Sequence, residues 1–180
     1  MTTYVALLRG VNVGKAKRVP MAEFKKLLAG LGHEDVVTLL NSGNAVFRSK
    51  SVAPARIASD IAGAISRKLT VEVPVIVKSA KEIAAIVADN PFEVDASEHS
   101  RFLVVFTQDS ATLAELAAIP SLATPPERFA IGRHAAYLHC AEGILKSKAG
   151  EALLGRIGRR ATTRNLATTL KLLALAGKTA

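Results

Sequence analysis

The order in which strand-like and helix-like hydrophobic patterns alternate is the strongest constraint on the fold of this chain. Short apolar runs bounded by turn residues are typical of strands, and they occur at Thr3–Val11, Val36–Leu40, Ala45–Phe47 and Val71–Val77. Apolar residues at helical spacing follow Pro20 and recur from Ala55 to Leu69. The resulting order, βαββαβ, predicts a ferredoxin-like α+β unit over residues 1–79.

The second half of the chain partly repeats this order. We expect strands at Arg101–Phe106, Arg128–Ile131 and Ala135–Cys140, and helices at Lys81–Ala88, Ala111–Ala118, Ile144–Ile157 and Leu166–Ala176. No low-complexity linker separates the two halves. The sequence therefore predicts an α+β fold of two ferredoxin-like subdomains, 1–79 and 80–180, packed as one body with extra C-terminal helices.

Composition restricts the class of protein. Of the 180 residues, 49% are hydrophobic, which excludes wholesale disorder. The single cysteine, Cys140, excludes a disulfide within the chain and a zinc site built from cysteines. No apolar run reaches the roughly 18 residues of a membrane span, and the N-terminal segment resembles a strand more than a signal peptide. We therefore expect a cytoplasmic protein that makes no membrane contact.

Positive charge is concentrated at both ends of the chain. Residues 1–50 carry 8 basic and 3 acidic side chains, and residues 141–180 carry 8 and 2, within a net charge of +9. The stretch between them, 51–140, is slightly acidic. If the fold brings the two ends together, they would form one positive surface that attracts anionic partners. The alternative is that these lysines and arginines only keep the protein soluble.

The first loop, from Arg9 to Lys15, joins a strand to a helix, a junction at which free backbone N–H groups favour anions. Its Gly10 and Gly14 are one residue too close for a phosphate-binding loop, and Ala16 stands where that motif needs Ser or Thr. The loop therefore does not indicate a nucleoside triphosphatase. A general anion-binding loop and a plain flexible connection both remain open.

Two further polar segments each have a structural and a functional interpretation. Ser42–Asn44 is typical of a tight turn, because Ser and Asn hydrogen-bond nearby backbone groups. Thr162–Asn165 precedes a predicted helix and is partly a helix cap. Capping needs no guanidinium, so Arg164 is a candidate for a bidentate grip on a phosphate or carboxylate.

Catalysis has weak support in the sequence. The four histidines are scattered without metal-ligand spacing, and the polar motifs contain no Asp or Glu that could act as acid or base. His139 and Cys140 are neighbours on a predicted strand, so their side chains point to opposite faces; Cys140 is interpreted as a small core residue. An RNA-recognition module is disfavoured, because the strands that need stacking aromatics offer only Tyr4 and Phe47. We predict no cofactor and no metal site, and we assign no catalytic residue.

Three separated motifs resemble those of one family. They are Ala6–Gly14 with Val19–Glu23, Asn41–Asn44 with Phe47, and Thr163–Asn165 with Thr168 and Leu172, preceded by the pair Ser147-Lys148. In this order they resemble the bacterial family called domain of unknown function 1697. The resemblance covers essentially the whole chain and implies two ferredoxin-like subdomains without an established activity. The chain has Lys15 and Leu166 where the family usually has Gly and Trp, and the lost Trp removes an aromatic that could stack on a ligand.

We expect the matched polar residues to form a site for an anionic ligand. The residues expected to neutralise its charge are Arg9, Lys15, Lys148 and Arg164. Those expected to orient it by hydrogen bonds are Asn12, Ser42, Asn44 and Asn165. Nucleic acid is the favoured ligand, and a small phosphorylated metabolite or nucleotide is the first alternative. An enzyme that acts on such a ligand and an adaptor for another protein are the remaining ones.

Overall fold

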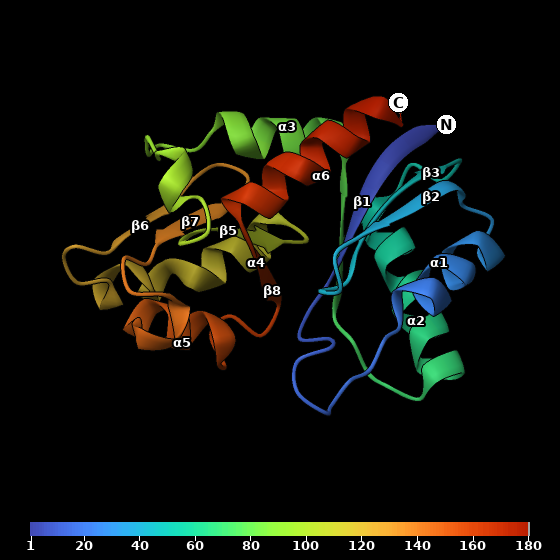
Figure 1. Cartoon of the computed structure of the whole chain (residues 1–180), viewed down its shortest axis with the longest axis horizontal. Helices are drawn as coiled ribbons and strands as arrows, with labels where there is room; N and C mark the ends of the chain where they lie inside the picture. The colour runs from blue at the N-terminus through green and yellow to red at the C-terminus, as the bar shows by residue number, and fades with distance from the viewer. Residues whose placement is uncertain (180) are drawn as a thin grey trace. The chain divides into compact units, whose positions relative to one another are not determined.

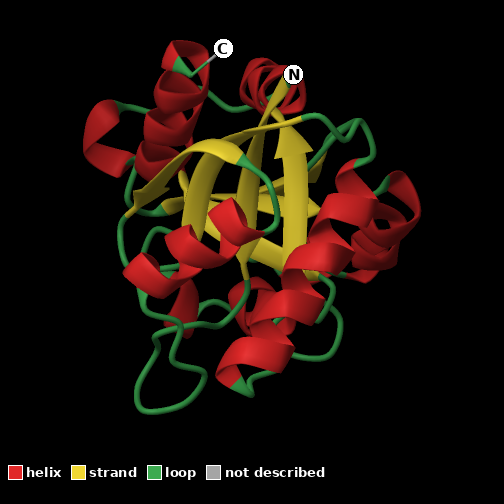
Figure 2. Cartoon of the chain, turned by 90° about the vertical axis from the view of Figure 1, so that its right-hand side faces the viewer, coloured by secondary structure: helices red, strands yellow, loops and turns green. Residues whose placement is uncertain are grey.

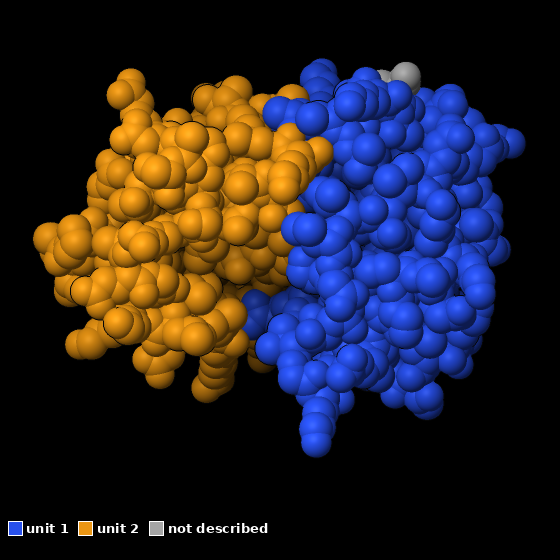
Figure 3. Space-filling view, viewed as in Figure 1, with its two compact units in different colours: residues 1–83, 172–180 blue, residues 84–171 orange. Residues whose placement is uncertain are grey.

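The chain forms two compact units in the computed structural model, which describes residues 1–179 (Figure 3). Unit 1 consists of Met1–Ile83 together with Leu172–Ala180, and unit 2 consists of Ala84–Lys171. Each unit contains a four-stranded antiparallel sheet and helices, so the protein is of the expected α+β class. The boundary at residues 79 and 80, as a division between domains, stays a prediction. Among the described residues, we find no helix with the length and apolar character of a membrane span.

The sheet of unit 1 has the strand order β2-β3-β1-β4 and is antiparallel throughout. The elements that build it are β1 (Thr2–Leu8), α1 (Met21–Gly30), β2 (Glu34–Leu39), β3 (Asn44–Ser49), α2 (Pro54–Leu69) and β4 (Val75–Ser79). Helices α1 and α2 cover one face of this sheet (Figures 1 and 2). Alternate residues of β1, namely Tyr4, Ala6 and Leu8, belong to the core on that face, because side chains alternate between the faces of a strand.

Local sequence explains the bounds of the helices in unit 1. Pro54 stands in the first turn of α2, where its missing N–H breaks no helical bond. The apolar stripe of α2, formed by Ile57, Ile61 and Ile65, is buried as the helical spacing predicts. Helix α1 ends just before Gly32, whose φ of +85° is the left-handed conformation that stops a helix.

The sheet of unit 2 has the same relative strand order, β6-β7-β5-β8, and is also antiparallel. The remaining elements are α3 (Ala80–Ala88), β5 (Phe102–Thr107), α4 (Ser110–Ala114), β6 (Arg128–Ile131), β7 (Ala136–His139), α5 (Lys148–Leu154), β8 (Ala161–Asn165) and α6 (Leu166–Lys178). Short 3₁₀ helices occur at Ala96–Glu98, Glu115–Ala118, Pro120–Leu122 and Ile144–Lys146. The short helices α4 and α5 contribute to an apolar core in which Leu113, Leu138 and Leu153 are buried.

Several elements differ from the sequence-based predictions. Strand β1 ends at Leu8 instead of Val11, and the helix predicted at Ala111–Ala118 is α4 followed by a 3₁₀ turn. Strand β4 begins at Val75 and not at Val71, because Pro74 has no N–H to donate to a neighbouring strand. The carbonyl oxygen of Pro74 accepts the N–H of Arg9 at 3.0 Å. The helix predicted from residue 144 is a 3₁₀ turn followed by the shorter α5, which ends at Gly155. Thr162–Asn165 belong to β8, which was not predicted because polar side chains give no apolar alternation; pairing with β5 makes this segment a strand.

Candidate functional site

The loop between β1 and α1, residues 9–20, carries a cluster of positive charge, and we call it the basic loop. Its cations Lys15, Lys17 and Arg18 are exposed. The ion pairs found among the described residues involve other cations. The first acidic residue of the chain, Glu23, comes after the loop, so the loop's own sequence does not neutralise its charge. Of these three cations, only Lys15 was predicted from the sequence to contact a ligand, although Lys17 and Arg18 follow it closely in the same loop.

Asn12 fixes the base of the basic loop. Its Nδ2 donates to the carbonyl oxygens of Val19, at 2.9 Å, and of Asn41, at 2.7 Å, while its Oδ1 accepts the Val19 N–H at 2.9 Å. Its own N–H donates to the carbonyl oxygen of Lys17 at 3.1 Å. Asn12 has a φ of +57°, which asparagine tolerates better than most residues. The bond to Asn41 also joins the basic loop to the turn between β2 and β3.

The turn between β2 and β3 packs closely against the end of β1. The carbonyl oxygen of Gly43 accepts the Leu8 N–H at 2.8 Å. A Cβ atom on Gly43 would lie 2.6 Å from Leu8 Cβ and 2.8 Å from Val11 Cγ2, and the φ of Gly43 is +82°. Glycine is therefore required here both by the close approach and by the backbone conformation.

Ser42 and Asn44 hydrogen-bond to each other within this turn. The Nδ2 of Asn44 donates to Ser42 Oγ and to the carbonyl oxygen of Leu39, both at 3.0 Å, and Asn44 is fully buried. The structure thus brings Asn12, Ser42 and Asn44 together at the base of the basic loop. Their hydrogen bonds stabilise the loop and the turn. That they contact a ligand stays a prediction.

The two arginines of the predicted site are less accessible than the cations of the basic loop. Arg9 is partly buried in unit 1, and this burial lowers the pKa of its guanidinium from the ordinary value. Arg164 lies on β8 in unit 2, and its Nη1 donates to Thr162 Oγ1 at 2.9 Å and to the carbonyl oxygen of Thr163 at 2.7 Å. Desolvation lowers the pKa of Arg164 to about 10, so its guanidinium stays charged at neutral pH.

The other predicted residues of unit 2 lie where helices begin. Asn165 caps α6, because its Oδ1 accepts the Thr168 N–H at 2.8 Å. Ser147 caps α5 in the same way, with its Oγ accepting the Gly150 N–H at 2.9 Å. Lys148 is the first residue of α5 and is exposed. The cap interpretation of Asn165 is therefore confirmed, and Lys148 presents its charge to solvent.

Lys148 lines two open cavities of unit 2. The first has a volume of about 280 Å³, and its lining includes Glu142 and Lys146, whose side chains lie 3.6 Å apart. The second has a volume of about 480 Å³, and its lining includes Glu151 and Arg156. Because both cavities combine cations with carboxylates, they suit a small polar molecule better than a long polyanion.

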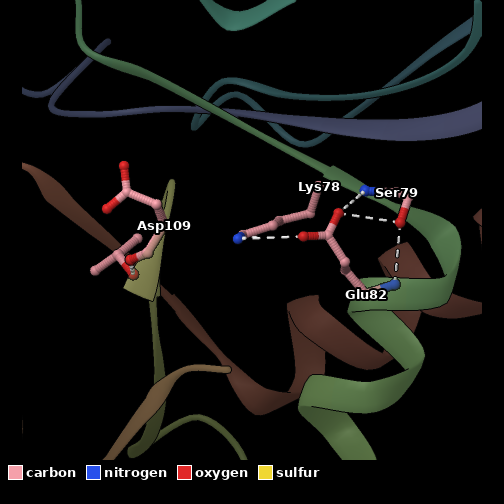
Figure 4. Close-up of polar contacts among 5 residues, drawn as sticks. Lys78, Ser79, Glu82 and Asp109 are labelled. Carbon is pink, nitrogen blue, oxygen red and sulfur yellow. Dashed lines mark hydrogen bonds and ion pairs between the residues drawn. The ribbon is translucent and has the colours of Figure 1, made fainter. Parts of the chain in front are cut away.

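A lysine near the end of β4 is buried, which was not predicted from the sequence. Lys78 is only 6% exposed, and its Nζ lies 3.5 Å from Glu82 Oε1 (Figure 4). The Oε2 of Glu82 accepts the Ser79 N–H at 2.8 Å, and Ser79 Oγ accepts the Glu82 N–H at 3.2 Å. This reciprocal pair is a capping box at the start of α3, and its signal in the sequence is the Ser-x-x-Glu spacing.

Lys78 and Arg164 occupy corresponding positions in the two sheets. Lys78 pairs with Val5 on the first strand of unit 1, and Arg164 pairs with Val104 on the first strand of unit 2. Each lies on an edge strand and directly precedes the residue that caps the next helix. This repeated placement of a buried cation supports the interpretation that the second half of the chain repeats the first.

The histidines and the cysteine belong to no metal-binding cluster among residues 1–179. No group of three or more His, Cys, Asp or Glu side chains in this range could hold a metal ion. The Nε2 of His139 lies 3.0 Å from Glu98 Oε2. Cys140 is buried, and this burial raises the pKa of its thiol to about 11. Its interpretation as a core residue is confirmed.

The two sheets and the basic loop define an α+β protein with a polar, cationic connection in its first unit. Comparison with known proteins identifies the family: the model described as protein of unknown function (DUF1697) matches residues 1–137, so the chain belongs to this family. The solved structure of the conserved bacterial protein SP0830 from Streptococcus pneumoniae has the same fold. It is 24% identical with a TM-score of 0.78, over 97% of this chain and 98% of that one. No curated protein matches the chain.

Proposed function

We propose that this protein binds an anionic ligand, with nucleic acid favoured, through the basic loop of unit 1. One observation carries the proposal. The exposed cations Lys15, Lys17 and Arg18 lie on a loop whose base is fixed by the hydrogen bonds of Asn12. A loop that is already ordered loses less conformational freedom when it binds, so more of the attraction contributes to affinity.

Nucleic acid fits this loop because its phosphates are closely spaced along the backbone. Several cations on one short segment can contact successive phosphates, and each contact releases counterions into solution. In unit 2, the cations Lys148, Arg156 and Arg159 are exposed. Arg160 is partly neutralised by Glu115, at 2.7 Å. We propose that the exposed cations of unit 2 add long-range attraction for a polyanion without reading its sequence.

Within the proposal, the buried and capping residues play a supporting part. Arg9 adds charge at the start of the basic loop, and Asn12, Ser42 and Asn44 keep the loop in place. In unit 2, Arg164 adds charge on β8, and Asn165 keeps the start of α6 in place by capping it. That the protein acts in the cytoplasm, without a membrane partner, stays a prediction.

We also infer that both units are ferredoxin-like subdomains. The element order βαββαβ and the strand order β2-β3-β1-β4 support this description for unit 1. The same relative strand order supports it for unit 2, with 3₁₀ turns and short helices in place of the longer helices.

A second candidate function is the binding, or the enzymatic conversion, of a small phosphorylated molecule. The cavities beside Lys148 favour it, because they are of suitable size and place a cation at their edge. This function predicts binding of a nucleotide or sugar phosphate that persists at about 200 mM salt, where multiple phosphate contacts to a polyanion are already weakened. Replacement of Lys148 by Ala would abolish that binding.

The first experiment measures fluorescence anisotropy with labelled single- and double-stranded DNA and RNA between about 50 and 200 mM salt. Wild type is compared with a variant that removes the charge of the loop, Lys15→Ala/Lys17→Ala/Arg18→Ala. A matched control loses three exposed cations elsewhere in unit 1, Lys50→Ala/Lys81→Ala/Arg67→Ala.

We expect salt-sensitive binding by wild type and by the control. In the loop variant the slope of log affinity against log salt falls by about 0.9 for each duplex phosphate contact that is lost. Equal losses in both variants would show that the effect is one of net charge and not of the loop. Binding of wild type that does not depend on salt would contradict the proposal.

A further inference from the structure

Two exposed apolar side chains lie at the base of the basic loop. Val13 is 74% exposed and Leu40 is 53% exposed. Val13 directly follows Asn12, and Leu40 directly precedes Asn41. The 2.7 Å hydrogen bond from Asn12 Nδ2 to the carbonyl oxygen of Asn41 holds these two segments side by side. We call Val13 and Leu40 the apolar pair.

The turn keeps Leu40 in an unusual conformation. Its neighbour Leu39 still pairs with Asn44 in the β2–β3 ladder, so Leu40 is the first residue of the turn. Its φ is +58°, a left-handed conformation that a bulky residue rarely adopts. Neither this conformation nor the exposure of its side chain stabilises the fold, and strained positions of this kind cluster at functional sites.

The aromatic residues of unit 1 are not available to unpaired bases. Tyr4, Phe24 and Phe47 are each exposed by 2% or less. Recognition of single strands depends largely on the stacking of bases on aromatic side chains. A basic segment with aliphatic side chains at its surface instead fits duplex DNA, into which apolar side chains insert between base steps while cations hold the phosphates.

We propose, as an extension of the proposed function, that the basic loop binds duplex DNA and that the apolar pair inserts at a deformable base step. Lys15, Lys17 and Arg18 contact phosphates beside the step, and Leu40 with Val13 replaces part of the lost stacking by apolar contact. The protein then prefers flexible pyrimidine–purine steps over stiff sequences. It also prefers a duplex with a single-base bulge over a continuous one, because the bulged step is already partly unstacked.

The test uses the full chain and short DNA duplexes that differ only by a single-base bulge. Anisotropy gives the affinities, and 2-aminopurine placed beside the bulge reports unstacking by a rise in its fluorescence. The variant Val13→Ser/Leu40→Ser is compared with a matched control, Val52→Ser/Leu145→Ser, which removes apolar side chains that are 81% and 88% exposed elsewhere. Circular dichroism melts establish that both variants are folded.

We expect wild type and the control to favour the bulged duplex by about tenfold. The apolar-pair variant loses this preference and the fluorescence rise, while its salt slope stays that of wild type. A preference that survives in the variant, equal affinity of wild type for both duplexes, or tighter binding to single strands would overturn the inference and leave the basic loop as the binding site. Absence of salt-sensitive binding to any nucleic acid would overturn the proposed function as well.

Discussion

The two units of this protein share one strand order but connect their strands differently. In unit 1, the connection from the first strand to the first helix is the basic loop, residues 9–20. In unit 2, the corresponding connection between β5 and α4 is Gln108 and Asp109, and Asp109 Oδ1 caps the helix by accepting the Thr112 N–H at 2.7 Å. The sheet therefore does not require a long connection at this point. The longer connection in unit 1 carries exposed cations, and surface loops of this kind often carry function.

The helices of the two units differ as well. In unit 1, α2 extends from Pro54 to Leu69 and buries a stripe of isoleucines against the sheet. In unit 2, the corresponding segment between β7 and β8 contains a 3₁₀ turn and the short α5. The same sheet thus accepts either a long amphipathic helix or several short turns, provided that apolar side chains still cover one of its faces.

The largest effect on stability is expected at the turn that supports the basic loop. In Gly43→Ala, the new Cβ would lie 2.6 Å from Leu8 Cβ, and the φ of +82° is unfavourable for alanine. The left-handed conformation and the overpacking together lower the free energy of unfolding by about 2–4 kcal/mol. Urea denaturation measures the loss. Gly143→Ala in unit 2 is the contrast, because its φ is also positive, at +91°, but a new Cβ there would meet no atom within 4 Å; a larger loss at Gly143 would reverse the comparison.

A smaller effect is expected when the hydrogen bonds of the connections are removed. Asn12→Ala removes side-chain bonds to Val19 and Asn41, and we expect a loss of about 2 kcal/mol. Ser147→Ala in unit 2 removes the capping bond to the Gly150 N–H and is expected to cost about 1 kcal/mol. Hydrogen exchange of the Val19 amide checks the first variant, since its acceptor is Asn12 Oδ1. Unchanged protection there would show that the basic loop is ordered without Asn12.

The pH dependence of stability is expected to involve His33 in unit 1. Its Nε2 is buried without a hydrogen-bond partner among the described residues, and burial lowers its pKa, opposed by a weaker effect of Asp60. The unfolded state therefore binds the proton more readily. The stabilisation is complete above the unfolded pKa of about 6.5 and is lost as the pH falls through that value toward the lower folded pKa. Melting curves across this range should show a smaller loss in His33→Leu than in wild type, and no difference in His134→Leu, where the side chain is exposed.

The smallest effect is expected at the cysteine of unit 2. The buried thiol of Cys140 has a pKa raised to about 11, so little reactive thiolate forms at pH 8. We expect alkylation by iodoacetamide in the folded protein to be at least about tenfold slower than in urea. Rapid alkylation without urea would show that the core of unit 2 opens more readily than its packing indicates.

The elements of the fold were predicted where the signal was local. The stripe of Ile57, Ile61 and Ile65 predicted α2, and the polar turn at residues 41–44 predicted the junction of β2 and β3. Strand β8 was missed, because its strand character comes from pairing with β5 and not from its own side chains. The late start of β4 was missed, because the exact register depends on which partner groups the neighbouring strand offers.

In the candidate site, too, the features that depend on contacts between distant segments could not be predicted from the sequence. Its residue types were visible in the sequence, but the difference between exposed Lys15 and buried Arg164 was not. The burial of Lys78 was likewise invisible, since a lysine in a sequence gives no sign of its surroundings. Exposure is a property of packing between distant segments, and it decides which cations can meet a ligand.

The sequence by itself determined the α+β class, most of the element order and the concentration of charge in the first loop. Periodic apolar side chains and turn residues act over a few neighbouring positions, so they can be recognised without the rest of the chain. Tertiary structure alone decided the bond between Asn12 and Asn41, the corresponding burial of Lys78 and Arg164, and the exposure of Val13 in the basic loop. Each of these depends on contacts between residues far apart in sequence, which only the folded chain brings together.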